Sequence, residues 1–256
     1  MRRRLKQTIY LLAFLVFWGG IFSGVYLLYF QVPPSCFDTK QNQGEEGIDC
    51  GGPCKRFCVP QNLTDIQLDG LPIVFNPVPD RVSVLLKLRN PNVEFGAKQV
   101  GYTVRVYGEN PSSTLDIVGS TFLYAGEIKY VPLIRPTASI GRATRADISI
   151  ATSTTTWLPA SLMSKPAIRI QDAQTTADNQ QGVRVAGRVI NDDVLPVTNV
   201  SVSALFFGIN GGVVGVSQTE LPSLDAGESI SFLIVHPPIT GIAPEATQVF
   251  VTALKP

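Results

Sequence analysis

The sequence predicts an all-β protein, built as two tandem antiparallel, immunoglobulin-like β-sandwiches behind a single N-terminal transmembrane helix. Three observations support this prediction. A stretch of 22 residues near the amino end holds no charged residue, the rest of the chain alternates apolar and polar residues in short runs, and these runs recur at a shift of 101 residues. The 22 glycines and 19 prolines also favour many short strands over long helices.

Residues 9–30 form the predicted transmembrane helix. At about 1.5 Å per residue, a helix of this length would span roughly 33 Å, enough for a hydrocarbon core of about 30 Å. A cleaved signal peptide is the alternative. Its apolar core is usually about 7 to 15 residues long, however, and no Ala-x-Ala-like cleavage site follows this stretch. We therefore expect an uncleaved anchor.

The basic residues Arg2, Arg3, Arg4 and Lys6 precede this span, and the first thirty residues contain no acid. Because positive charge is retained on the cytoplasmic side, we expect residues 1–8 to be a cytoplasmic tail. The C-terminal bulk is then extracytoplasmic, the chain passes once through the cell membrane, and the lipid bilayer is its first partner. A total charge of +1 provides no basic field, so we expect no nucleic-acid partner.

Gly20 and Gly24 lie four residues apart within the span. This Gly-x-x-x-Gly spacing lets two membrane helices approach closely, which predicts a homodimer through one helix face. Glycine is also common in membrane helices without such a role, and this alternative stays open.

The four cysteines Cys36, Cys50, Cys54 and Cys58 fall within residues 31–61, the predicted extracytoplasmic stalk. An exported segment lies where disulfides persist, so an even number of cysteines predicts two bridges. Three connectivities are open. Zinc is the alternative, but the three-residue spacings differ from the Cys-x2-Cys pairs of zinc ribbons, and oxidation competes outside the cell.

The loop between the first two cysteines is rich in oxygen ligands. Asp38, Asn42, Glu46 and Asp49 are spaced so that the loop could wrap a calcium ion. The pattern departs from an EF-hand, because Lys40 occupies the third position and no helices flank the loop. Calcium is thus one expectation for a cofactor, and a solvated acidic loop without any cofactor is the other.

The cysteine segment also carries a resemblance. Cys36-x-Asp38, followed from Asn42 by Asn-Gln-Gly-Glu-x-Gly-x-Asp-Cys-Gly-Gly-x-Cys, resembles a small cysteine motif that recurs in secreted and surface-anchored microbial proteins. The motif covers about a tenth of the chain. The resemblance implies an exported module and no defined activity.

The rest of the chain divides into two related halves, predicted as modules over residues 62–156 and 163–256, with a joint near residues 152–166 that contains Trp157. Positions that match at the shift of 101 are Val82, Val84, Leu88 and Asn90 with Val183, Val185, Val189 and Asn191, residues 125–127 with 226–228, and Ile148 and Ile150 with Val249 and Val251. Two copies of one fold are implied. Trp157 is expected to pack in a core or between the modules.

Within each half the apolar residues alternate with a period of two, which is typical of half-buried strands. The predicted strands are residues 83–88, 102–107, 120–125, 128–134 and 146–151 in the first half, and residues 183–190, 200–207, 211–218, 230–235 and 248–254 in the second. Asn210-Gly211 predicts a hairpin turn. So many short strands favour a sandwich, and a barrel is the alternative that the pattern leaves open.

Two further resemblances concern the modules. Leu88-Arg89-Asn90-Pro91-Asn92, followed by Gly101-Tyr102-x-Val104, resembles the opening of the late-embryogenesis-abundant type 2 (WHy) domains. Residues 187–191, 196–200 and 224–232 are similar to the bacterial FxLYD-type domain, with Leu205-Phe206-Phe207 in place of its Leu-Tyr. Both resemblances imply a β-sandwich without catalysis.

Little in the sequence points to an enzyme. The single histidine, His236, precedes two prolines at the end of a predicted strand, where it is poorly placed to be a general base, and no catalytic motif occurs. We therefore expect a non-enzymatic protein with a structural or protein-binding role at the cell envelope, whose partner is another envelope protein or a surface polymer. An accessory subunit of a secretion or pilus-type machine is the alternative.

Overall fold

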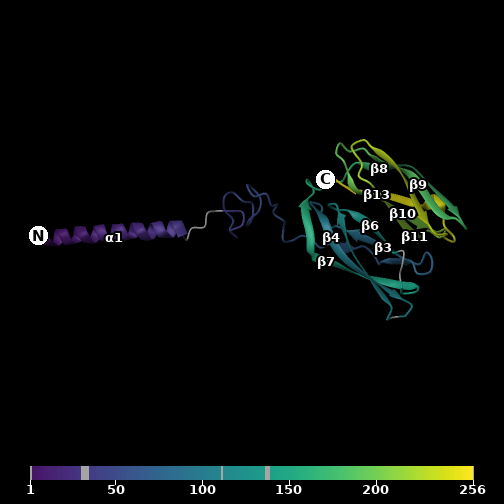
Figure 1. The fold of residues 1–256 in the computed structure, drawn as a ribbon, viewed down its shortest axis with the longest axis horizontal. Helices are drawn as coiled ribbons and strands as arrows, with labels where there is room; N and C mark the ends of the chain where they lie inside the picture. The colour runs from purple at the N-terminus through teal and green to yellow at the C-terminus, as the bar shows by residue number, and fades with distance from the viewer. Residues whose placement is uncertain (1, 30–34, 111, 136–138, 256) are drawn as a thin grey trace. The chain divides into compact units, whose positions relative to one another are not determined.

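The computed structural model of the chain describes residues 2–29, 35–110, 112–135 and 139–255. It divides into two compact units, Met1–Pro60 and Gln61–Pro256. The first unit holds helix α1 (Arg2–Tyr29) and the cysteine-containing segment, and the second holds the β-strands. Figure 1 shows this order of elements along the chain.

Helix α1 confirms the apolar helix that the sequence predicts. Within the described part of the chain it is the one helix long and apolar enough to cross a membrane. It begins at Arg2, earlier than the predicted span, because the arginines and the lysine that precede the span are good helix formers. Residue 30, the predicted end of the span, lies outside the described residues.

The first module consists of two antiparallel sheets. In one, β3 pairs with β6 on one side and with the short strands β1 and β2 on the other; in the second, the order is β5-β4-β7. The strands are β1 (Gln67–Leu68), β2 (Ile73–Phe75), β3 (Val82–Arg89), β4 (Phe95–Gly108), β5 (Thr114–Leu123), β6 (Ile128–Arg135) and β7 (Ala143–Pro159).

The second module has the same arrangement of two sheets, ordered β12-β9-β8 and β11-β10-β13. Its elements are β8 (Ile168–Asp178), β9 (Gly182–Asn191), β10 (Thr198–Phe207), β11 (Val213–Leu221), β12 (Ser229–His236), the short 3-10 helix η1 (Pro244–Ala246) and β13 (Gln248–Leu254). Its strands run from green to yellow in Figure 1. The hairpin predicted at Asn210-Gly211 joins β10 to β11, with Gly211 at a φ of 78°.

The strand registers of the two modules correspond closely. Val82 on β3 lies opposite Arg135 on β6, and 101 residues later Val183 on β9 lies opposite His236 on β12. In the neighbouring pair the shift is 100 residues, since Val104 on β4 lies opposite Ile117 whereas Ala204 on β10 lies opposite Ser217. One residue fewer therefore separates β9 from β10 than separates β3 from β4.

Each module has its own apolar core, filled by alternate residues of its two sheets. The first core includes Val84, Leu86 and Leu88 of β3 with Val104 of β4, and the second is centred on Phe206 of β10. Burial of each such side chain contributes about 1.5–3 kcal/mol to stability. The all-β class and the two tandem sandwiches are thereby confirmed.

Strand β7 continues through the region expected as a joint. Its last residues pair with the beginning of β4, Pro159 opposite Phe95, and Trp157 packs against the core of the first module. Residues 152–155 form a bulge, in which the hydroxyls of Thr154 and Thr155 bond to the carbonyl oxygen of Ala151. The threonine-rich run is therefore a strand with an interruption.

A third apolar cluster joins the two modules. Leu85 of β3 packs with Leu205 of β10 and Val216 of β11, all at most 3% exposed. The ring centres of Tyr130 and Phe250 lie 5.5 Å apart at its margin. Because apolar area is removed from water between them, the two sandwiches form one compact unit.

Candidate functional site

The cysteine segment is closed by two disulfides, Cys36–Cys54 and Cys50–Cys58. The sequence left three connectivities open, and the structure has this one. No free cysteine occurs among the described residues. All four thiols are thus oxidised, and none is available as the thiolate that the zinc alternative requires.

The residues predicted to bind calcium brace the loop. The carboxylate of Asp49 accepts the main-chain N–H groups of Asp38 and Thr39 at 3.0 Å, and Asp38 accepts a 2.8 Å hydrogen bond from the Asn42 amide. This amide, helped by main-chain donors, lowers the pKa of Asp38. Glu46 contributes its carbonyl oxygen to the Gln41 amide. Calcium binding here stays a prediction.

Glu45 is the acid of this loop that the sequence did not single out. Its side chain is buried, and one carboxylate oxygen accepts the N–H groups of Asn42 and Asp49 at 3.3 and 3.2 Å. The other oxygen lies 2.9 Å from the Cys54 sulfur. Within the described ranges, the one cluster of three ligand-type groups is Cys36, Glu45 and Cys54, and its two sulfurs are bonded to each other.

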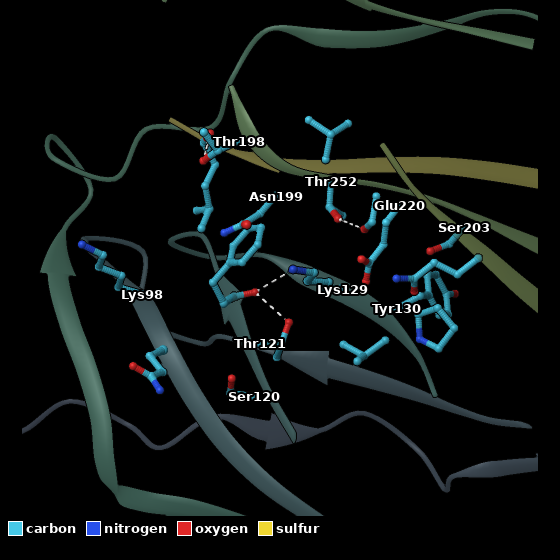
Figure 2. Close-up of a pocket in the computed structure, with 18 of the residues that line it drawn as sticks. Lys98, Ser120, Thr121, Lys129, Tyr130, Thr198, Asn199, Ser203, Glu220 and Thr252 are labelled. Carbon is cyan, nitrogen blue, oxygen red and sulfur yellow. Dashed lines mark hydrogen bonds between the residues drawn. The ribbon is translucent and has the colours of Figure 1, made fainter. Parts of the chain in front are cut away.

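A groove of about 1030 Å³ lies between the two modules of the strand-bearing unit (Figure 2). Its walls come from β4, β5, β6 and β7 of the first module and from β10, β11 and β13 of the second. The polar lining residues are Lys98, Gln99, Tyr102, Ser120, Thr121, Lys129, Tyr130, Thr156, Thr198, Asn199, Ser201, Ser203, Gln218, Glu220, Ser223 and Thr252. Hydroxyl and amide side chains therefore dominate the lining.

Lys129 is the most deeply placed charge in this groove. Its side chain is 7% exposed, and its ammonium donates a 2.9 Å hydrogen bond to the carbonyl oxygen of Phe122 and lies 3.3 Å from the centre of the Phe122 ring. None of the ion pairs among the described residues includes Lys129. Burial lowers the pKa of this ammonium to about 8, against the attraction of Glu127.

Irregular backbone borders the groove. The register of β4 shifts between Ala97 and Val100, and that of β10 shifts between Thr198 and Ser201. Within the second bulge, Asn199 adopts a φ of 51°, in the left-handed region that few side chains enter. Such bulges redirect side chains, and they are concentrated next to binding and active sites.

The asparagines that open the repeated motifs lie elsewhere and are structural. Asn90 donates through its amide to the carbonyl oxygens of Phe95 and Tyr124 at 2.8 and 2.9 Å. Asn191 donates likewise to Leu195 and Asp225 at 2.9 and 3.0 Å. Both side chains are buried and hold the turn that contains a glycine at positive φ, Gly126 or Gly227.

His236 is buried, with 5% of its surface exposed. Its Nδ1 lies 2.8 Å from the carbonyl oxygen of Pro237, and its ring centre lies 5.1 Å from that of Phe206. Burial lowers the pKa of the imidazole. A ring packed in this way supports the core of the second module and presents no nitrogen to the groove.

The sequence did not predict the groove, because it arises from the packing of the modules. The one available signal is the alternation in β10, where the outward positions 201 and 203 are serines whereas 205 and 207 are Leu and Phe. Such a change along one face indicates a boundary between packed and open surface.

Comparison with known proteins places the chain in no family. No family model matches it, and no curated protein matches it. The solved structures that are similar to this chain include two that match 75% of it at 10% identity. One is red sea bream transglutaminase, of which 32% is covered, with a TM-score of 0.22, so the chain spans about a third of that protein. The other is the N-terminal CBM22-1–CBM22-2 tandem domain of Paenibacillus barcinonensis Xyn10C, of which 87% is covered, with a TM-score of 0.16.

Proposed function

We propose that this chain is a non-enzymatic, single-pass membrane protein that displays its paired modules outside the cell, in a structural or protein-binding role at the envelope. The observation that carries the proposal is helix α1, which is long and apolar enough to cross a membrane, with basic residues only at its amino end. These charges favour a cytoplasmic amino end, so that the paired modules face outward.

The disulfides support the same orientation. Two bridges close a segment with few buried apolar residues, and Cys54 is its one buried hydrophobic residue among those described. Disulfides persist in oxidising compartments and are rare in the cytosol. The segment then serves as a braced spacer between the membrane and the modules.

The non-enzymatic assignment rests on the chemistry of the groove. Its charged lining residues are two lysines and one glutamate, and the single histidine of the chain packs in a core. Hydroxyl and amide side chains bind polar groups well but are weak acids and bases. A binding role therefore accounts for this lining better than catalysis does.

The two modules are best explained as copies of one ancestral unit. The corresponding strand orders, the register shifts of 100 and 101 residues, and the similar bonds of Asn90 and Asn191 support this proposal. Kinship of the first module with the type 2 late-embryogenesis-abundant domains, and of the second with FxLYD-type domains, is proposed on the motifs alone.

A second role has one observation in its favour. Among the described residues outside the neighbouring backbone of α1, none comes within 4 Å of the position that a side chain would take at Gly20 or Gly24, so this face leaves room for another membrane helix. A helix partner there would fit an accessory subunit of a secretion or pilus-type machine. A second copy of this chain would instead make a homodimer.

Protease treatment of intact cells tests the proposal. A tag after β13 is expected to be removed while a tag before α1 is protected, and the chain should remain in the membrane fraction after alkaline carbonate extraction. Sequencing of the mature amino end checks that α1 is retained. A mature protein that begins after α1, or a protected carboxyl-terminal tag, would refute the anchor or its orientation.

A further inference from the structure

The groove begins where the apolar contact between the modules ends. On the outer face of the β11-β10-β13 sheet, Leu205 and Val216 are cross-strand neighbours within the contact. The next two rows of the same face hold Ser203 with Gln218, and then Ser201 with Glu220 and Thr252. This wall therefore changes from apolar to hydrogen-bonding within two rows, and Figure 2 shows Ser203, Glu220 and Thr252 along it.

The opposite wall is the open side of the first sandwich. β5 pairs only with β4, and β6 pairs only with β3, among the described strands, so each has a free edge. The side chain of Lys129 points inward between β5 and β6, and its ammonium donates a hydrogen bond to the carbonyl oxygen of Phe122. An inward-pointing lysine is a device that keeps a free strand edge from pairing with another strand. The groove is thus poorly suited to an extended peptide.

The charges of the groove favour an anionic ligand. The ammonium of Lys129 is buried, and none of the ion pairs among the described residues includes it, although Glu127 attracts it from farther away. Burial of a charge without a direct ion pair costs free energy, which a closer counter-charge would offset. Lys98, at the bulge of β4, adds a second positive charge, against one carboxylate at Glu220. The remaining polar side chains are neutral donors and acceptors.

We propose that this groove binds an acidic glycan, in which a sugar carboxylate pairs with Lys129 and the sugar hydroxyls bind the serine, threonine and amide side chains of the two modules. Hydroxyls and amides both donate and accept, which matches the hydroxyl groups of sugars. The inference rests on the proposed function, since a groove displayed outside the cell would meet surface polymers.

Titration calorimetry of the full chain in detergent micelles tests the proposal, with an oligogalacturonate as the probe. A neutral maltooligosaccharide of the same length and an acidic peptide are the comparison ligands. We expect saturable binding of the oligogalacturonate alone. Lys129→Met should weaken it about tenfold or more, because a buried charge pair is lost. Lys98→Gln should weaken it less.

Two further variants separate the site from the fold. Lys40→Gln removes the same charge from the cysteine segment and should leave binding unchanged. Asn199→Gly keeps the left-handed backbone but removes the amide, and we expect weaker binding with an unaltered circular dichroism spectrum. This variant leaves the bond between Lys129 and Phe122 in place.

Several results would overturn the inference: no saturable binding of the oligogalacturonate, equal binding of the neutral sugar, tighter binding of the acidic peptide, or affinity unchanged in both Lys129→Met and Asn199→Gly. A chain that is anchored and exported but binds no oligogalacturonate refutes the glycan site and leaves the proposed function intact. A chain that binds the probe but is cleaved after α1 refutes the anchor alone.

Discussion

The ammonium of Lys129 on β6 and the carbonyl oxygen of Phe122 on β5 lie 2.9 Å apart, and this hydrogen bond joins the two sheets of the first sandwich at its open side. The bond satisfies one of three ammonium donors. The ammonium lies in a buried site, and this burial disfavours the protonated form and accounts for the lowered pKa of Lys129.

Replacement of this lysine should change how stability depends on pH. The pKa of Lys129 falls from 10.5 to about 8 in the folded protein. Between these values the unfolded chain holds a proton that the folded chain has released, so stability rises with pH, by about 3 kcal/mol at most. Lys129→Met should lack this rise and be at least as stable at pH 7. Urea unfolding at intervals from pH 7 to 10 measures both proteins, and a constant difference between them would contradict the buried charge.

The hydroxyl of Tyr124 donates a 2.6 Å hydrogen bond to the carbonyl oxygen of Ala253 in the other module. Tyr124→Phe leaves that buried carbonyl without its partner, and we expect a loss of about 1–3 kcal/mol. Tyr107→Phe is the matched control, because the Tyr107 ring packs under Arg145 and its hydroxyl makes no hydrogen bond in the described structure. Thermal unfolding should show a lower melting temperature for Tyr124→Phe than for Tyr107→Phe. Equal melting temperatures would show that this hydrogen bond does not stabilise the contact between the modules.

Asn90→Ala and Asn191→Ala should each destabilise one module. Each substitution removes an amide donor from two or more carbonyl oxygens and leaves the N–H of Asn92 or Asp193 without its side-chain acceptor, and we expect a loss of about 2 kcal/mol. Denaturant unfolding measures the loss. Asn62→Ala, at an exposed position, is the control. If one of the two variants is as stable as this control, the two asparagines do not contribute equally to the stability of their modules.

The lowered pKa of Asp193 predicts that the stability of the protein falls in acid. Its carboxylate accepts from the Lys255 ammonium at 2.7 Å and from main-chain N–H groups, which lowers its pKa to about 2. A depressed pKa contributes stability that is complete above the ordinary value near 3.8 and is lost as the pH falls towards 2. Asp193→Asn should therefore be less stable at neutral pH, with the difference closing below pH 4. A difference that persists at pH 2 would argue against this ionisation.

The disulfides should control access to the cysteine segment. Each bridge restricts the unfolded chain, by about 3 kcal/mol for a loop of this order in the entropic model. We expect Cys36→Ala with Cys54→Ala to accelerate tryptic cleavage after Lys40, which lies inside the larger loop with its separation of 18 residues. The Cys50→Ala, Cys58→Ala pair should have a smaller effect. Because Cys50 and Cys54 share one tryptic peptide, partial reduction and alkylation before peptide mapping checks the connectivity, and a Cys36–Cys50 bridge would contradict it.

The period-two alternation was sufficient to predict the strands of both cores, because burial of one face of a strand selects alternate apolar residues. The alternation did not predict β1, β2 and β8. The first two are short strands and the third is largely exposed, so none of them carries a clear apolar pattern. The joint is predicted over residues 152–166, because the hydroxyl side chains at its beginning do not alternate with apolar residues. Disulfide connectivity depends on loop paths that no spacing encodes.

The groove was beyond sequence reasoning for another reason. Lys129 sits at an inward position of a strand whose other inward residues are Val131 and Leu133, so the pattern alone shows only an interruption. That this open edge of the first module borders a second module follows from packing between residues more than 100 positions apart. Leu85 and Leu205 were visible as apolar residues, but their contact was not.

The two modules use different faces in their contact, because the sheet face of β3 and β6 in the first module packs against the sheet face of β10 and β11 in the second. A heterologous contact of this kind uses a different surface of each module, so each module keeps the other type of surface unused. At the positions that correspond to Leu205 and Val216, the first module carries the ion pair of Arg105 and Asp116, 2.7 Å apart. Burial of this ion pair under an apolar neighbour would cost free energy. The second module leaves Leu233 and Val235 exposed on β12. A further module packed in the same way would therefore meet apolar side chains on the second module and an ion pair on the first.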